Sequence, residues 1–327
     1  MALGGTQFSL SNTPQIKAHL RKARSRRGRA AFAKITTGVL LAVGLHNPLA
    51  AAIGAQAQSE WALALEWLAH LPAGALLLAD RLHGCAAFAA AATTACQRVG
   101  SHFLIRARSN VKVQVGQRFK DGSRRVRLPV RAKGRPREVL QWLELREIRV
   151  RVHRSGHRGQ ELRLWTTLLD PRSAPAQELI SRYARRWEHE LYYRELKHQW
   201  RKSVMLQSHT VETAAQEIAA LVLASALLAR ERMRAAGGVM PVLQLSLLKT
   251  LELMRPLWLT LALGGDLLTE EQKQQLTERF LQQAATLVTR KRPPPRSCPR
   301  AVRQPVSKWP RLIHNQSCEG PITFRLL

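Results

Sequence analysis

The sequence predicts a mixed α/β fold with a β-rich segment in the middle and a helical C-terminal part. Strand-like and helix-like runs alternate over residues 1–110, short strands separated by turn residues fill 111–169, and helical periodicity returns at Pro175. With 327 residues and 45% hydrophobic content, the chain is long enough to bury a large core. We therefore expect a globular protein of one or two domains.

The first 70 residues are expected to form three strands and a helix. The strands are GTQFSL at 5–10, then TTGVLLAV at 36–43 and LAAAIG at 49–54, which form a hairpin around a turn at Asn47-Pro48. Ser59 is a suitable N-cap for a helix from Glu60 to His70.

The next segment places an acidic residue at the end of a strand. ALLLA at 75–79 is a short buried strand that delivers Asp80 at its C-terminal end. An alanine-rich helix over 85–99 and a strand over 102–108 follow. After the β-rich segment we expect a long helix from Pro175, further helices over 211–236, 241–261 and 269–289, and an irregular tail from Arg290.

The charge of the chain points to a polyanionic partner. The formal net charge is +30 and the pI about 11.5, and basic residues concentrate over 17–34, 106–163 and 290–311. Nucleic acid is the first candidate partner, with an affinity that falls steeply with salt. An anionic membrane fits less well, because no strongly amphipathic basic helix stands out and the apolar stretch 36–55 is too interrupted to span a bilayer. The four cysteines form no CxxC pair and are expected to be reduced thiols in a cytoplasmic protein.

Four residues of chemical interest recur at helical spacing. Tyr183, Arg186, Glu190 and Lys197 are separated by 3, 4 and 7 residues. On a single helix the last three would point roughly −60°, −20° and −40° from the first. A candidate metal ligand would then lie among three groups suited to phosphate, which indicates phosphoryl transfer on nucleic acid. The alternative is a solvated amphipathic helix with i,i+4 ion pairs.

Several segments together resemble one enzyme family. They are LLLADR at 76–81, FLIRARSN at 103–110, TTLLDP at 166–171, SCPRAVRQPVSKWPR at 297–311, and the Tyr-x2-Arg-x3-Glu-x6-Lys spacing. This combination resembles the DDE transposases of the insertion-sequence-four family, which includes the transposon-five transposase. The resemblance extends over nearly the whole chain.

The resemblance implies an RNase H-like catalytic core interrupted by an inserted β-rich domain. The implied division is 1–110 for the first part of the core, 111–170 for the insertion, 171–235 for the second part of the core, 236–290 for C-terminal helices and 291–327 for a basic tail. It also implies two Mg²⁺ ions held by three carboxylates, with Asp80 as the second acid and Glu190 as the third.

The same resemblance assigns roles in DNA binding. Tyr183, Arg186 and Lys197 match the group that holds DNA phosphates beside the cut, and Arg106 matches a further basic residue that approaches DNA. Trp165 is the nearest candidate for stacking on a flipped base, with a core tryptophan as the favoured alternative. The implied partners are double-stranded DNA, comprising the terminal repeats of a mobile element and its target, and a second copy of the chain. The implied location is the bacterial nucleoid.

The sequence departs from the family pattern at the first acid. Gly4 stands where the first metal-binding Asp is expected, in the segment Ala2-Leu3-Gly4-Gly5-Thr6-Gln7-Phe8-Ser9. The first carboxylate is Glu60, whose helix position suits it poorly as a substitute. Relatives also carry an N-terminal region before this point, so the chain is expected to be a truncated or decayed copy, or to have been started at an internal Met.

These observations predict a cut-and-paste DNA transposase by descent whose own activity is lost. The alternative is a catalytically dead DNA-binding remnant that associates with intact transposase. A third reading, a basic RNA-binding structural protein, is disfavoured by the buried strand leading to Asp80. Gly4→Asp is expected to restore metal binding.

Overall fold

The computed structural model describes residues 1–327 except 23, 26–27, 55–57, 133, 154–159, 201–204, 290–322 and 327. The chain forms two compact units. Unit 1 comprises Met1–Leu71 and Arg185–Thr289, and unit 2 comprises Pro72–Ala184 and Arg290–Leu327. Both combine helices with β-sheet, which confirms the mixed α/β class. The boundary of unit 2 falls at Pro72, so the strand that precedes Asp80 belongs to the same unit as the β-rich segment.

Unit 1 contains a three-stranded antiparallel sheet. Its strands are β1 (Ala2–Ser9), β4 (Lys34–Ala42) and β5 (Asn47–Gly54), with β4 in the middle. The expected hairpin is confirmed, but its turn spans 43–46 with His46 at φ +51°, and Pro48 lies inside β5. Proline is compatible with this place because β5 is an edge strand, where a ladder N–H can be spared.

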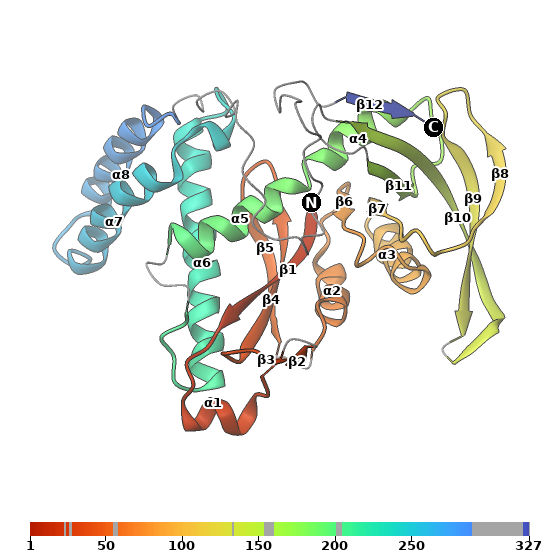
Figure 1. The fold of residues 1–327 in the computed structure, drawn as a ribbon. Coiled ribbons are helices and arrows are strands. Elements are labelled where there is room, and N and C mark those ends of the chain that lie inside the picture. Colours follow the sequence, from red (N-terminus) through yellow and green to blue (C-terminus); the bar gives the residue numbers. More distant parts are fainter. Residues whose placement is uncertain are drawn as a thin grey trace, which may run out of the picture. The chain divides into compact units, whose positions relative to one another are not determined.

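The helices of unit 1 can be followed in Figure 1. They are α1 (Pro14–His19), α2 (Glu60–Trp67), α5 (Trp187–His198), α6 (Val211–Ala236), α7 (Leu247–Leu263) and α8 (Glu270–Ala285), with the short turns η1 (Leu68–His70) and η2 (Val242–Gln244) and the small ribbon β2 (Arg24–Ser25) and β3 (Gly28–Arg29). Ser59, Thr210 and Thr269 cap α2, α6 and α8 with their hydroxyl groups.

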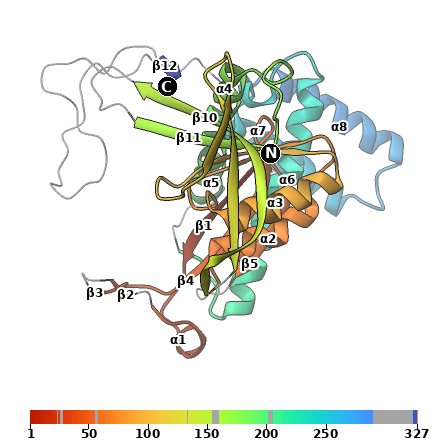
Figure 2. The same ribbon diagram turned by 90° about the vertical axis from the view of Figure 1, so that its right-hand side faces the viewer.

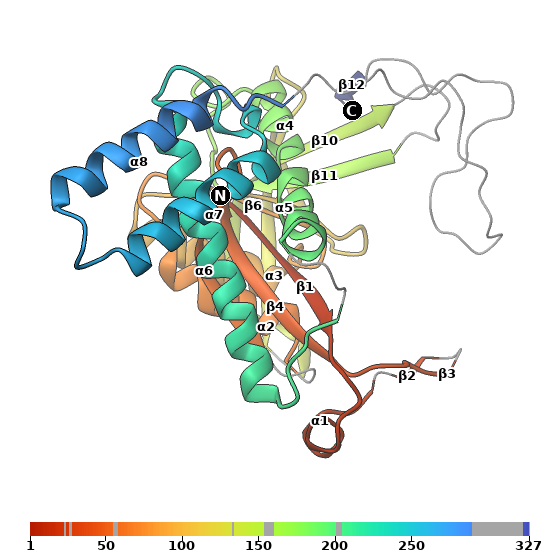
Figure 3. The ribbon, with the colours of Figure 1, turned by 90° about the vertical axis from the view of Figure 1, so that its left-hand side faces the viewer.

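Helix α6 is the longest helix of the described chain. By length and composition alone it could cross a membrane, the one such helix among the described residues. It packs against β5, α7 and α8, as can be followed in Figure 3. Its buried residues include Glu231 and Arg232. One side of α6 is therefore packed within unit 1, while Leu223 and Leu227 are exposed.

Unit 2 is built on a six-strand path. The order is β6 (Leu76–Ala79), β7 (His102–Arg106), β11 (Gln160–Thr166), β10 (Arg135–His153), β9 (Arg124–Ala132) and β8 (Gln114–Arg118), and β12 (Thr323–Leu326) pairs with β10. Strands β6 and β7 are parallel, and the other pairs are antiparallel. Helices α3 (Ala86–Arg98) and α4 (Ala176–Ala184) complete the unit, and the long β9 and β10 are prominent in Figure 2.

Two adjacent charged residues of β10 are both buried. Neighbouring side chains of a strand point to opposite faces, so Arg146 and Glu147 enter different environments. Arg146 donates to the Ser123 hydroxyl at 2.7 Å and to the Ala174 carbonyl at 2.6 Å, and it pairs with Asp121. Each buried charge therefore has its own partners on its own side of the strand.

Candidate active site

Asp80 lies directly after β6, as the sequence predicted. Its Oδ1 accepts hydrogen bonds from the Leu82 amide at 2.8 Å and from His83 Nδ1 at 3.0 Å. The side chain is 42% exposed. Because Ala79 pairs with Ile105 in the parallel ladder, Arg106 lies at the matching position of β7. Asp80 and Arg106 thus end neighbouring strands at the same edge.

His83 holds the Asp80 carboxylate from a buried position. Its ring has no exposed surface and packs on Phe88 at a centroid distance of 4.7 Å. Within the described chain, Nε2 has no hydrogen-bond partner, so the proton belongs on Nδ1, where it is donated to Asp80. This bond fixes Oδ1 and leaves Oδ2 to other partners.

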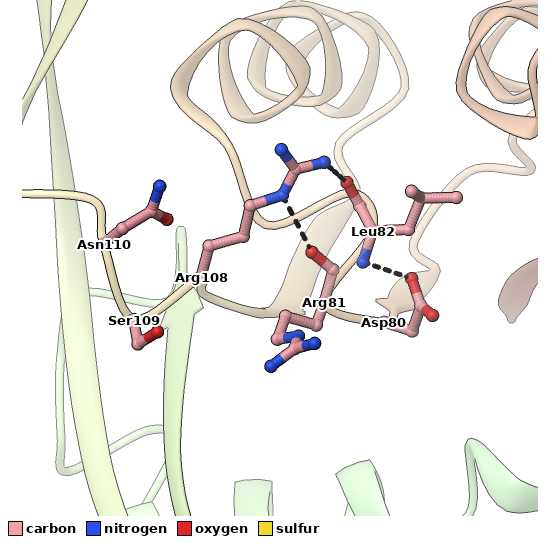
Figure 4. Close-up of a pocket in the computed structure, with 6 residues that line it drawn as sticks. All are labelled: Asp80, Arg81, Leu82, Arg108, Ser109 and Asn110. Carbon is pink, nitrogen blue, oxygen red and sulfur yellow. Dashed lines mark hydrogen bonds between the residues drawn. The ribbon is translucent and has the colours of Figure 1, made fainter. Parts of the chain in front are cut away.

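A pocket of about 480 Å³ opens beside Asp80, lined by Asp80, Arg81, Leu82, Arg108, Ser109 and Asn110 (Figure 4). Arg108 reaches across it and donates to the carbonyls of Arg81, at 3.2 Å, and Leu82. It thereby ties the loop after Asp80 to the segment after β7. The Arg81 side chain points away from the Arg108 guanidinium (Figure 4).

A second hollow of about 290 Å³ in unit 2 is strongly basic. It is lined by Arg81, Arg106, Ala107, Ser109, Arg149, Glu161 and Arg163. Arg106 therefore belongs to a cluster of four arginines around one carboxylate. Such a cluster suits a phosphate group.

Glu190 lies on α5 in unit 1 and is 45% exposed. It accepts a hydrogen bond from Arg186 at 2.8 Å, one turn earlier. Lys197 lies farther along the helix and donates to the Thr6 hydroxyl at 2.5 Å, with Nζ 5.3 Å from the centre of the Phe8 ring. Burial, with Lys34 nearby, lowers the pKa of Lys197. The structure thus brings Arg186 to Glu190 and Lys197 to β1.

Tyr183 does not share that helix, which corrects the expectation of one continuous stripe. The chain makes a turn at 185–186, so Tyr183 belongs to α4 and Glu190 to α5. The amides of Glu188 and His189 bond to carbonyls three residues earlier, a tighter turn than an α-helix makes. The rotation of 100° per residue therefore does not hold through the turn at 185–186, and it cannot be used to align Tyr183 with Glu190. Tyr183 is buried, and its hydroxyl donates to the Ala79 carbonyl at 3.3 Å, next to Asp80.

Trp165 is a core residue, which confirms the favoured alternative and removes the basis for base stacking in this conformation. Its side chain is fully buried, and Nε1 donates to Glu147 Oε2 at 3.0 Å. Two arginines donate to the same carboxylate. Arg163 Nε lies 3.1 Å from Oε2, and Arg124 Nε lies 3.0 Å from Oε1. The indole therefore helps to satisfy a buried charge.

Gly4 faces α5, but the space for a side chain there is filled. A Cβ atom on Gly4 would lie 2.7 Å from Cε1 and 2.8 Å from Nδ1 of His189. The His189 ring is 2% exposed, donates from Nε2 to the Val39 carbonyl at 3.0 Å and meets Tyr193 edge-on at 4.7 Å. Tyr193 in turn donates to the Gly4 carbonyl at 2.6 Å. Position 4 thus points toward the helix that carries Glu190, into a site occupied by an imidazole.

Glu60 reaches β1 at Gly5, on the opposite side of the strand from Gly4, which agrees with the expectation that it is poorly placed to replace an acid at position 4. Its Oε1 accepts the Gly5 amide at 2.7 Å, and a Cβ on Gly5 would lie 2.7 Å from the Glu60 side chain. The absence of side chains at both glycines lets His189 and Glu60 approach the strand. The sequence could have signalled part of this, because His189, Tyr193 and Lys197 recur every four residues along one face of α5.

Within either unit, no three His, Cys, Asp or Glu side chains of the described residues gather as metal ligands would. Position 4 has no carboxylate, Glu190 is paired with Arg186, and Glu60 uses one oxygen on a backbone amide. Asp80 belongs to the other unit.

Comparison with known proteins identifies the family. A family model described as "Transposase DDE domain" matches residues 7–227, a range that contains Asp80, Glu190 and the residues around them. A search of curated proteins found no match. Members of the matched family are enzymes that use divalent metal ions and bind DNA. Because the match spans more than half of the chain, this protein belongs to the DDE transposase family, the enzymes of DNA transposition.

Proposed function

We propose that this chain is an insertion-sequence-four-type transposase that has kept DNA binding and lost strand cleavage. The observation that carries the proposal is the pair Gly4 and His189. In support of it, glycine stands where the resemblance expects the first acid, and a Cβ atom at this position would meet the His189 ring. In this proposal the RNase H-like core consists of segments from both units, with the β-rich segment inserted between Asp80 and Glu190, which are the remaining two acids.

The residues that would hold a metal ion are Asp80 and Glu190. A divalent ion held by three carboxylates would activate a water or 3′-hydroxyl and stabilise the leaving oxygen. Two carboxylates supply fewer ligands and less negative charge than this chemistry requires. The proposed chain therefore binds Mg²⁺ weakly and cleaves DNA poorly.

DNA binding does not need the missing acid. Arg186, Lys197 and Arg106 remain, and the net charge of +30 supplies an attractive field over the whole chain. The proposed partners are double-stranded DNA, including the ends of the element, and a second copy of the chain. A protein with six or more phosphate contacts should lose at least about 10³-fold in affinity for duplex DNA between 50 and 200 mM salt.

A nicking assay tests the loss of cleavage. Supercoiled plasmid is incubated with the chain in Mg²⁺ or Mn²⁺, alongside Glu190→Ala, Asp80→Ala and Glu60→Ala prepared identically. We expect the four proteins to give the same background of nicked circles, because none completes the metal site. Nicking by the natural chain that disappears in Glu190→Ala and Asp80→Ala would overturn the proposal. If nicking by the natural chain also disappeared in Glu60→Ala, Glu60 would be identified as a replacement acid.

A further inference from the structure

The first amide of helix α4 is satisfied by a residue from a distant turn. Pro175, which precedes the helix, has no side-chain oxygen with which to cap it. Asp121, in the turn between β8 and β9, supplies that oxygen, and its Oδ2 accepts a hydrogen bond from the Ala176 amide at 3.1 Å. A carboxylate in this position also interacts favourably with the positive end of the helix dipole. The start of α4 is therefore held by a residue 55 positions earlier in the chain.

Asp121 is itself held in place by the buried Arg146. Its Oδ1 accepts a hydrogen bond from the Ser123 amide at 3.1 Å, and its Oδ2 pairs with the Arg146 guanidinium. Arg146 also donates to the Ala174 carbonyl at 2.6 Å, two residues before the helix. Burial alone would raise the pKa of Asp121, but the hydrogen bonds from Ser123 and the charge of Arg146 outweigh it and hold the pKa below its ordinary value. A charged pair thus joins the turn to the segment that leads into α4.

The other end of α4 reaches the edge that bears Asp80. The buried face of the helix comprises Ala176, Leu179, Ile180 and Tyr183, at the spacing of one helical side. The Tyr183 hydroxyl donates to the Ala79 carbonyl at 3.3 Å, and Ala79 is the last residue of β6. With a rise of about 1.5 Å per residue, Ala176 and Tyr183 lie about 10 Å apart along the helix axis. Helix α4 therefore connects the Asp121 turn to the peptide that leads into Asp80.

We propose that Asp121, held by Arg146, is a positioning residue for the edge that presents Asp80. Asp121 fixes the start of α4, and α4 fixes the end of β6 through Tyr183. A nine-residue helix is too short to be stable alone in water, so its place depends on the contacts of its ends and its buried face. A turn of the β-rich segment thereby determines where a proposed metal ligand lies. The role of Asp80 as a ligand rests on the proposed function, whereas the positioning by α4 does not.

NMR of a fluorotyrosine-labelled protein observes the end of α4 directly, because the chain has only three tyrosines. Tyr183→Phe identifies the fluorine resonance of Tyr183. Asp121→Ala should shift this resonance and leave those of Tyr192 and Tyr193, which belong to unit 1, unchanged. The backbone amide resonance of Asp80 should shift with it, because this amide and the Ala79 carbonyl belong to one peptide group. Asp121→Asn keeps one acceptor oxygen and should cause smaller shifts.

Amide hydrogen exchange measures the start of α4. Ala176 is the first residue of this helix, a position whose amide has no partner within the helix. Ala86 is the matched comparison, because it opens α3, which has no side-chain cap in the described chain. After correction for intrinsic rates, Ala176 should exchange about 10- to 150-fold more slowly than Ala86, the factor for one hydrogen bond to a charged group. Asp121→Ala should remove this difference.

Glu178→Ala is the control for a change of charge near the start of α4. Glu178 lies in the first turn of the helix, is exposed and pairs with Arg182. Its loss should leave the Ala176 exchange and the Tyr183 resonance close to those of the natural chain. An Asp80 amide or a Tyr183 resonance that does not shift in Asp121→Ala would overturn the proposal, because the start of α4 would then have no effect on its end. Unchanged exchange of Ala176 in this variant would overturn it as well.

A further measurement uses the unaltered protein, in case Asp121→Ala folds poorly. Native-state hydrogen exchange is followed at increasing urea concentrations below the unfolding transition. The amides of α4 and β6 should open with the same free energy and the same dependence on urea, as one cooperative unit. Exchange of α4 through a separate opening of lower free energy, with β6 still protected, would contradict the proposal. These measurements use neither DNA nor metal, so their outcome is independent of whether the proposed loss of cleavage is correct.

Discussion

Gly4→Ala is expected to lower the free energy of unfolding by about 1–3 kcal/mol. The same substitution made in a His189→Ala protein should cost much less. The added Cβ would lie 2.7 Å from Cε1 of a buried ring that is held by the Val39 carbonyl and by Tyr193. The ring cannot withdraw without breaking these contacts, so the overlap becomes strain. Urea denaturation of the two single variants and the double variant measures the coupling between the positions.

Gly116→Ala is the matched control for this cycle. Gly116 also lies in a strand, β8, but a Cβ there would come no closer than 3.4 Å to its nearest neighbour. Alanine in a strand is accommodated well, so this change should be neutral or slightly stabilising. Additive effects of Gly4→Ala and His189→Ala would show that the ring moves freely and that the site is open.

The same contact changes what is expected of Gly4→Asp. From the sequence alone, this substitution should restore metal binding. With the imidazole in place, we expect no gain in Mn²⁺ affinity from Gly4→Asp by calorimetry, and a gain only when His189 is replaced by a smaller residue. A gain from Gly4→Asp alone would mean that His189 leaves the site at little cost.

Glu147→Gln is expected to lower the free energy of unfolding by about 3–5 kcal/mol at neutral pH. The carboxylate is fully buried and accepts hydrogen bonds from Arg124, Arg163 and Trp165. A neutral amide of the same shape leaves the two guanidinium groups without their counter-charge, which is costly in the interior. Glu144→Gln, an exposed carboxylate on the same strand, should change stability by less than about 1 kcal/mol.

The difference in free energy of unfolding between the natural chain and Glu147→Gln should depend on pH. Burial alone would raise the pKa of Glu147, but the hydrogen bonds from Arg163, Trp165 and Arg124 outweigh it and hold the pKa below its ordinary value. A carboxyl whose pKa is lower when folded contributes its full stability above about pH 4.3, the ordinary value, and loses it as the pH falls through the folded pKa. The difference between the two proteins should therefore be largest above about pH 5 and shrink in acid. A difference that stays constant down to pH 3 would contradict a charged Glu147.

Local patterns in the sequence predicted most elements and the position of Asp80. Apolar periodicity gave the bounds of α6, and the apolar run 75–79 led correctly to Asp80 at the end of β6. The break at 185–186 was missed because both flanking segments carry good helix formers and no glycine or proline marks the turn. The four residues at the family spacing thus lie on two helices, with Tyr183 on α4 and Arg186, Glu190 and Lys197 at or after the start of α5.

Contacts between distant segments were beyond the reach of the sequence. Glu147 lies in an alternating run where a charged residue is expected to face solvent, yet both faces of β10 are covered at this point. Nothing in the sequence near Gly4 indicates that His189, 185 positions later, fills its place. Glu60 likewise meets Gly5 through the packing of α2 on the sheet. Such pairings depend on tertiary structure alone.

The imidazole beside Gly4 also bears on how the proposed loss of cleavage could be reversed. An acid introduced at position 4 alone would press against the His189 ring, and replacement of His189 alone would leave a hole beside β1. Under the proposed function, recovery of the site would need both changes. The packing of one side chain would then make the loss of an acid harder to reverse.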